Sequence, residues 1–233
     1  MITKNALANG TSYMPNRITV TPTMKKLSLA AHVLAVAVTL FATSAHAQDI
    51  CVVNGGRSTV RLNLGLILTL TKTNIGLTGT DTSQRTLGFI NFPITSGAIS
   101  LGTSAGQILH SGGMILTSGT TTVTLDSLIV DTLSDNPFVT ALVEVNGNFV
   151  GRVKLFDFVL PSGLTLPIVP NQGAFYLSGV QLTLDYEAAM ALNQAFGYKA
   201  FAPGAEFGDL QSMVFVPLTA AGPVSGPVPV KHF

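Results

Sequence analysis

Short apolar stretches rich in β-branched residues recur through most of this chain, and turn residues separate them. The turns include Ser118-Gly119, Asn136-Pro137 and Asn146-Gly147. The stretches span 87–94, 98–101, 107–110, 114–116, 121–130, 139–145, 149–160, 174–184 and 213–218. Many short strands at this spacing are typical of an antiparallel sandwich or barrel. The sequence therefore predicts an all-β fold, an antiparallel β-sandwich or a barrel-like fold.

Apolar side chains also occupy every second position from Val60 to Leu70. Most of the positions between them hold polar residues or glycine, such as Arg61 and Asn63. A period of two places alternate side chains on opposite faces of a strand. We therefore expect a half-buried strand over residues 60–70.

The segment around Asn146-Gly147 predicts a β-hairpin whose register depends on the loop length. A two-residue loop would place Glu144 opposite Phe149 and mix the polar and apolar faces. A three-residue loop keeps one face apolar, with Asn148 in the left-handed conformation, and we expect this register. It pairs Val145 with Phe149, Val143 with Gly151, Ala141 with Val153, and Val139 with Leu155.

One short α-helix is predicted near the C-terminus. Thr183 is the expected N-cap, and Asp185 and Glu187 place negative charge in the first turn, where the helix dipole favours it. Residues 188–196 are mostly good helix formers, and Gly197 supplies the stop.

The N-terminal segment has the pattern of a secretory signal peptide. A basic start at Met24-Lys25-Lys26 precedes a short apolar run and an Ala45-His46-Ala47 cleavage site. Residues 1–23 are either a long extension of this signal or lie before the true start at Met24. We expect cleavage near Ala47, a secreted or periplasmic location, one β-rich domain over residues 48–220, and a Pro-rich flexible tail over 221–233. The mature chain has no predicted transmembrane span.

Composition excludes several functions. The net charge is +1 and charged residues make up 10% of the chain, so the basic surface that nucleic acid requires is absent. Cys51 is the single cysteine, and beyond residue 47 the histidines are His110 and His232, too few for a zinc site. No Gly-x-Ser-x-Gly motif or phosphate-binding loop occurs. We expect no catalytic residues, no metal site and no enzyme activity.

Three stretches resemble the HtaA-type domain of secreted haem-uptake proteins. The first, Gly106–Leu116, joins a strand containing His110 to a glycine turn and a returning strand. The second, Val123–Asp131, resembles the strand that follows. The third runs from Leu182-Thr183 through an Ala-rich helix to Phe196-Gly197-Tyr198 and Pro203-Gly204.

This resemblance implies an extracytoplasmic domain that holds haem against a tyrosine, which a histidine supports. His110 matches the supporting histidine and Tyr198 matches the C-terminal aromatic residue of the family. The axial tyrosine of the family lies in an N-terminal segment, but residues 48–86 of this chain contain no aromatic residue. Tyr176, Tyr186 and Tyr198 are therefore the candidate donors, and tyrosine oxygen is a known ligand of haem iron.

Two functional hypotheses follow. The first is a binding protein that holds haem or another apolar ligand between a sheet edge and the helix. The second is a structural or adhesive cell-envelope protein, which binds an envelope protein partner and no small molecule.

Overall fold

The computed structural model describes residues 50–80 and 82–218, and these residues form twelve strands and two helices. The predicted signal peptide and the predicted tail lie outside the described residues. The proposed domain bounds therefore stay predictions.

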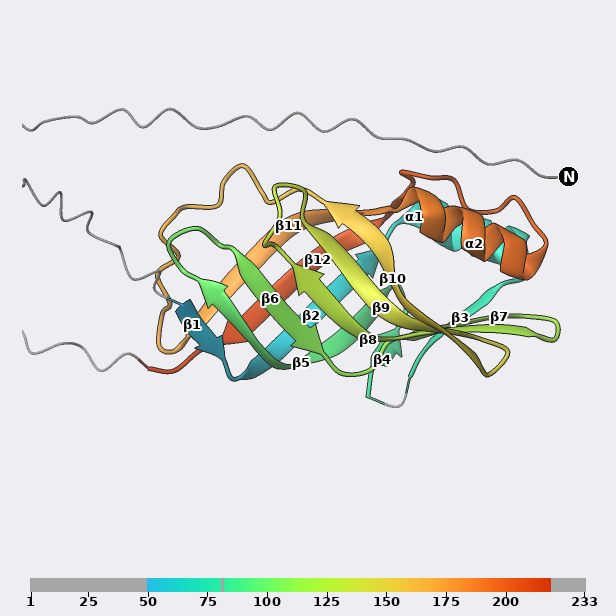
Figure 1. Cartoon of the computed structure of the whole chain (residues 1–233). Helices are drawn as coiled ribbons and strands as arrows, with labels where there is room; N and C mark the ends of the chain where they lie inside the picture. The colour runs from blue at the N-terminus through green and yellow to red at the C-terminus, as the bar shows by residue number, and fades with distance from the viewer. Residues whose placement is uncertain (1–49, 81, 219–233) are drawn as a thin grey trace, which may run out of the picture. The chain divides into compact units, whose positions relative to one another are not determined.

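Eight antiparallel strands close into a barrel, which confirms the predicted fold class (Figure 1). Around the barrel, β5 pairs with β2, and the order continues through β12, β11, β10, β9 and β8 to β6, which pairs with β5 again. The eight strands are β2 (Gly55–Leu62), β5 (Phe89–Ser100), β6 (Gly106–His110), β8 (Thr121–Asp131), β9 (Phe138–Val145), β10 (Asn148–Phe158), β11 (Ala174–Leu184) and β12 (Glu206–Phe215).

Four short strands extend this barrel. β1 (Ile50–Val53) and β4 (Gln84–Thr86) both pair with β5, and β3 (Gly76–Gly79) pairs with β7 (Met114–Ser118). The first half of β8 pairs with β7, while its second half pairs with β6 and closes the barrel. The helices α1 (Leu64–Lys72) and α2 (Tyr186–Phe196) lie at the same end of the barrel (Figure 1).

The strand that we expected over residues 60–70 is wrong beyond Leu62. There β2 ends, and the side chain of Asn63 accepts a hydrogen bond from the amide of Gly65 at 2.7 Å, which caps α1. In a helix, leucines four residues apart share one face, whereas the leucine between them points away from it. Leu70 is buried and Leu66 packs against the core, whereas Leu68 is exposed.

The hairpin between β9 and β10 begins with the two-residue loop, so Val145 pairs with Asn148 and not with Phe149, and it returns further along to the register that we expected. Its turn has two residues, Asn146 and Gly147, both with positive φ, so the three-residue loop with a left-handed Asn148 is wrong. A bulge after Phe149 then absorbs one residue. The expected pairs Val143 with Gly151 and Ala141 with Val153 are therefore confirmed. A second bulge pairs Val139 with Phe156 instead of Leu155.

The N-cap of helix α2 lies two residues later than expected. Asp185, and not Thr183, is the N-cap, because its carboxylate accepts hydrogen bonds from the amides of Glu187 and Ala188 at 3.0 and 3.4 Å. Thr183 belongs to β11, where its hydroxyl donates to the carbonyl of Asp157. Gly197 ends the helix with a left-handed φ of 71°, as predicted.

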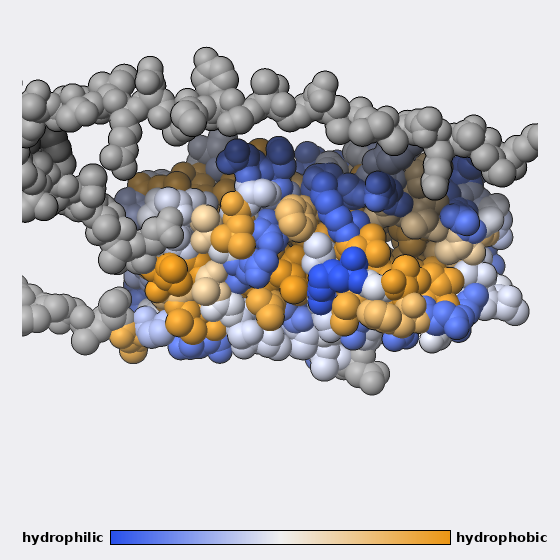
Figure 2. Space-filling model, viewed as in Figure 1, coloured by the Kyte–Doolittle hydropathy of each residue, from blue (hydrophilic) through white to orange (hydrophobic). Residues whose placement is uncertain are grey.

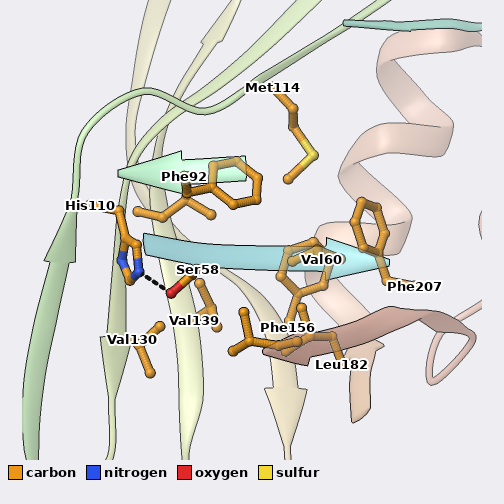
Figure 3. A pocket seen from close by; sticks show the side chains of 12 residues that line it. Ser58, Val60, Phe92, His110, Met114, Val130, Val139, Phe156, Leu182 and Phe207 are labelled. Atoms are coloured by element: carbon orange, nitrogen blue, oxygen red, sulfur yellow. Dashed lines mark hydrogen bonds between the residues drawn. The ribbon is translucent and has the colours of Figure 1, made fainter. Parts of the chain in front are cut away.

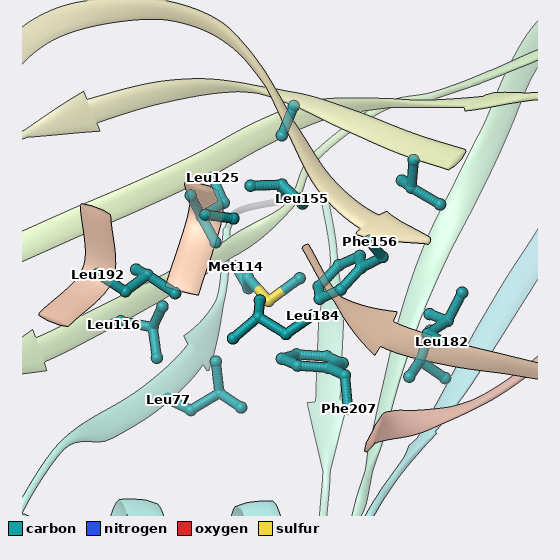
Figure 4. Close-up of a cluster of buried hydrophobic side chains, with 14 of the residues drawn as sticks. Leu77, Met114, Leu116, Leu125, Leu155, Phe156, Leu182, Leu184, Leu192 and Phe207 are labelled. Atoms are coloured by element: carbon teal, nitrogen blue, oxygen red, sulfur yellow. The ribbon is translucent and has the colours of Figure 1, made fainter. Parts of the chain in front are cut away.

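Apolar side chains fill the barrel in two clusters. The larger cluster reaches from the barrel to both helices and includes the rings of Phe156 and Phe207, which are tilted at 45° with their centroids 4.5 Å apart (Figure 4). The smaller one fills the other end and includes Ile99, Phe175 and Val214. This division leaves a short polar layer between them, and His110 belongs to it.

Candidate functional site

A polar chain of three side chains crosses the interior of the barrel. The Nε2 atom of His110 lies 2.7 Å from the Oγ atom of Ser58, and this Oγ lies 2.8 Å from the Oγ of Ser212 (Figure 3). The three residues come from β6, β2 and β12 and are 6%, 2% and 8% exposed. Pairing of β2 with β12 places Ser58 directly opposite Ser212, and β5 joins β2 to β6, which carries His110.

Two small cavities flank this polar chain. They have volumes of about 20 and 30 Å³, and His110 and Ser58 line both. The other walls are mostly apolar, including Phe92 and Phe156 in the first cavity and Phe175 in the second. A buried water occupies roughly this much space, so each cavity can hold one or two water molecules and nothing of the size of haem.

Burial lowers the pKa of His110 to about 4, and the backbone of Leu128 and Ile108 opposes this effect in part. The imidazole is therefore neutral near pH 7, with one N–H group and one lone pair. Its Nδ1 atom is buried without a hydrogen-bond partner. His110 thus lies in the barrel interior as a neutral imidazole.

Tyr186 is the first residue of α2 and Tyr198 follows its C-cap, and both line a groove between this helix and the segment that follows it. We call this the outer groove, and it has a volume of about 940 Å³. The two tyrosines are 64% and 46% exposed. The segment after the helix is fixed by Asn193, whose side chain bonds the amide and the carbonyl of Phe201 at 2.9 and 2.8 Å.

Tyr176 lies elsewhere. It belongs to β11, is 70% exposed, and lines the 30 Å³ cavity together with His110. The structure therefore groups the four predicted site residues in two pairs, Tyr186 with Tyr198 and His110 with Tyr176. His110 lines neither groove beside α2, so it is not positioned to support Tyr186 or Tyr198.

A second groove lies between α2 and the sheet formed by β8, β9 and β10. We call it the inner groove, and its volume is about 300 Å³. Figure 2 shows a hollow bordered by apolar surface in this region. Its lining consists of Val123, Leu125, Val143, Val145, Val150, Val153, Leu155, Ala188, Ala191, Leu192, Gln194 and Ala195. Sequence reasoning missed this groove, although the alanines at 188, 191 and 195 indicate one helix face of small residues.

The outer groove meets part of the chemistry that haem requires. The phenol oxygens of Tyr186 and Tyr198 are suitable donors for ferric haem, and the groove is of sufficient size. Lys199 also lines the groove and provides a positive charge near these oxygens. The outer groove therefore fits haem in donor type and volume, but it contains no histidine that could support a tyrosinate.

Other kinds of site find no support in the part of the chain that the structure describes. Within residues 50–80 and 82–218, no three His, Cys, Asp or Glu side chains are grouped so that they could hold a metal ion. The same residues include no helix that is long and apolar enough to cross a membrane.

Comparison with known proteins yields matches in structure alone. No family model and no curated protein matches the chain. The C-terminal domain of HtaA from Corynebacterium glutamicum superposes with a TM-score of 0.55 at 15% identity, over 72% of this chain and 99% of that domain. The N-terminal domain of the same protein gives 0.53 at 12% identity, over 71% and 98%. The chain therefore has the fold of an HtaA-type domain, as the three sequence stretches predicted.

Proposed function

We propose that this chain is a non-enzymatic, extracytoplasmic binding protein that holds haem in the outer groove. The observation that carries the proposal is the pair of tyrosines, Tyr186 and Tyr198, at one groove beside α2 in a fold of the HtaA type. The predicted signal peptide supports the extracytoplasmic location. The exported protein should accordingly begin near Gln48, which the mass of the mature chain would test.

Tyr198 is the better placed of the two donors. It follows Gly197, the left-handed C-cap of α2, and its amide donates to the carbonyl of Asn193 at 3.2 Å. Its backbone is thus fixed relative to the helix, and it is less exposed than Tyr186. We infer that Tyr198 provides the axial oxygen and that Lys199 attracts the negatively charged propionates. Haem itself would supply the iron centre that the tyrosine oxygen binds.

Hemin titration of the purified mature chain tests this proposal. We expect a Soret shift, and we expect Tyr198→Phe to weaken binding by about tenfold or more, because the ring remains but the ligating oxygen is lost. Tyr186→Phe should have a smaller effect. Tyr176→Phe is the matched control, since it removes the same oxygen from an exposed tyrosine outside the groove.

The role of His110 distinguishes this proposal from the arrangement that the family resemblance implies, in which a histidine supports the haem-binding tyrosine. Because His110 lines the barrel interior, a folded His110→Gln variant should keep the Soret shift of the wild type. The absence of any shift in the wild-type protein at tens of micromolar hemin would overturn the haem proposal. The structural or adhesive envelope role would then be the remaining hypothesis.

A further inference from the structure

We propose that the inner groove is a separate binding site for the aliphatic chain of a single-chain amphiphile. The groove is bounded by α2 on one side and by β8, β9 and β10 on the other. Its volume of about 300 Å³ is at the lower end of the range for small-molecule sites. The proposal does not depend on haem binding in the outer groove.

The walls of the inner groove belong to the hydrophobic core. Val123, Leu155 and Leu192 are 1%, 2% and 7% exposed, and all three are members of the larger core cluster. Protein interiors are normally packed without spaces of this size. Figure 4 shows Leu192 of α2 facing Leu125 and Leu116 across this end of the core. A ligand-sized opening among such side chains is therefore a feature to be filled by an apolar molecule.

Ordered water is a poor occupant of this groove. A buried water molecule needs two to four polar partners. Gln194 is the one polar side chain in the lining, and it lies on the exposed side of α2. Water in the groove would thus lack hydrogen bonds along the valine and leucine walls, and an apolar ligand would gain free energy by displacing it.

The lack of charge in the lining of the inner groove indicates which kind of ligand it can bind. No charged or aromatic residue lines the groove. On β10, Arg152 and Lys154 alternate with Val153 and lie on the other face, where Arg152 bonds the carbonyl of Ser127 and Lys154 pairs with Asp157. The groove therefore suits an uncharged alkyl chain. A polar head group would stay at the opening, near Gln194 and the exposed Val150.

The two grooves are distinct. They share Ala191 and Gln194 of α2, but the remaining walls differ, being the strands in one case and residues 197–202 in the other. Both tyrosines line the outer groove alone. Substitutions can therefore affect one groove without the other.

Fluorescence titration with N-decyl dansylamide, an uncharged probe with one alkyl chain, tests the proposal in the full mature chain. We expect a blue-shifted increase in emission, displacement by decanol, and no response to dansylamide without the chain. Ala195→Phe places a ring in the inner groove and should weaken binding at least tenfold. Ala98→Phe is the matched control, since Ala98 is exposed on β5 and lines neither groove.

A second variant covers the case in which Ala195→Phe does not fold. Val150 is 59% exposed at the opening, so Val150→Asp should fold and should weaken the binding of the uncharged probe. Equal responses to dansylamide with and without the alkyl chain would overturn the proposal. Wild-type affinity in folded Ala195→Phe, or in Val150→Asp, would do the same. Tyr198→Phe should bind the probe normally, which separates this result from failure of the haem proposal.

Discussion

The imidazole of His110 and the hydroxyl of Ser58 form a 2.7 Å hydrogen bond in the middle of the barrel, between the two apolar clusters. A neutral histidine satisfies this bond, because Nε2 and the serine oxygen can each donate or accept. A protonated histidine would place a full charge where the surrounding side chains are apolar and no carboxylate lines either cavity. The barrel interior therefore favours the neutral form.

This arrangement predicts a loss of stability in mild acid. The pKa of His110 is about 4 in the folded protein and 6.5 as an ordinary value. Above pH 6.5 both states are neutral and stability is unaffected. Between these values the unfolded chain binds a proton that the folded chain does not, so stability falls as the pH is lowered. The full difference is about 3 kcal/mol, reached near the lower pKa.

Urea unfolding of the wild type and of His110→Gln at about pH 7.5 and about pH 5 would measure this effect. His110→Gln should be less stable at the higher pH, since its amide fits the polar chain less well. The wild type should lose more stability than the variant between the two pH values. An equal loss in both proteins would show that His110 does not cause the acid sensitivity.

The fold class could be predicted because alternation and turn residues are local signals. The closure of the barrel could not, since it depends on pairing between β6 and β5 and between β6 and β8. Residues 63–70 show most clearly what the sequence alone could not decide. Their leucines are compatible with a strand or a helix, and the Asn63 cap decides in favour of α1. The bulges in β10 also depend on its pairing with β9, so the sequence alone does not indicate where they lie.

The candidate site could be predicted only in part, because some of its residues carry a local sequence signal while others come together through distant strands. Tyr198 was identified from the resemblance of its segment to the C-terminal part of HtaA-type domains, and it lines a groove beside α2. His110 was identified because it matches the supporting histidine of the same family. Its partners Ser58 and Ser212 come from strands at the two ends of the described chain, so its burial follows from barrel closure. The inner groove is likewise formed by four elements that are separate in sequence.

A second prediction concerns the start of α2. Burial alone would raise the pKa of Asp185, but hydrogen bonds from Lys154 and from the amides of Ala188 and Glu187 outweigh it and lower the pKa. The stabilisation is present above the ordinary pKa and is lost as the pH falls through the lowered one. Asp185→Ala should reduce the unfolding free energy by about 1–2 kcal/mol in thermal or urea unfolding at neutral pH.

Asp185→Asn provides the control for this prediction. Asparagine retains an oxygen that can cap the helix but loses the ion pair with Lys154, whose Nζ lies 3.2 Å from the carboxylate. Its loss of stability should therefore be smaller than that of Asp185→Ala. If the two variants were equally destabilised, the charge and not the cap would be the main contribution of Asp185.

The turn between β6 and β7 leads to a last prediction. A methyl group on Gly113 would overlap the carbonyl oxygen of Leu125, and hydrogen bonds to Thr80 hold this backbone in place. Gly113→Ala should therefore cost about 3 kcal/mol or more. Gly119 has a φ of +57° but open space around it, so Gly119→Ala should cost about 1 kcal/mol. Urea unfolding of both variants measures the difference, and equal losses would mean that the close approach to β8 does not require glycine at position 113.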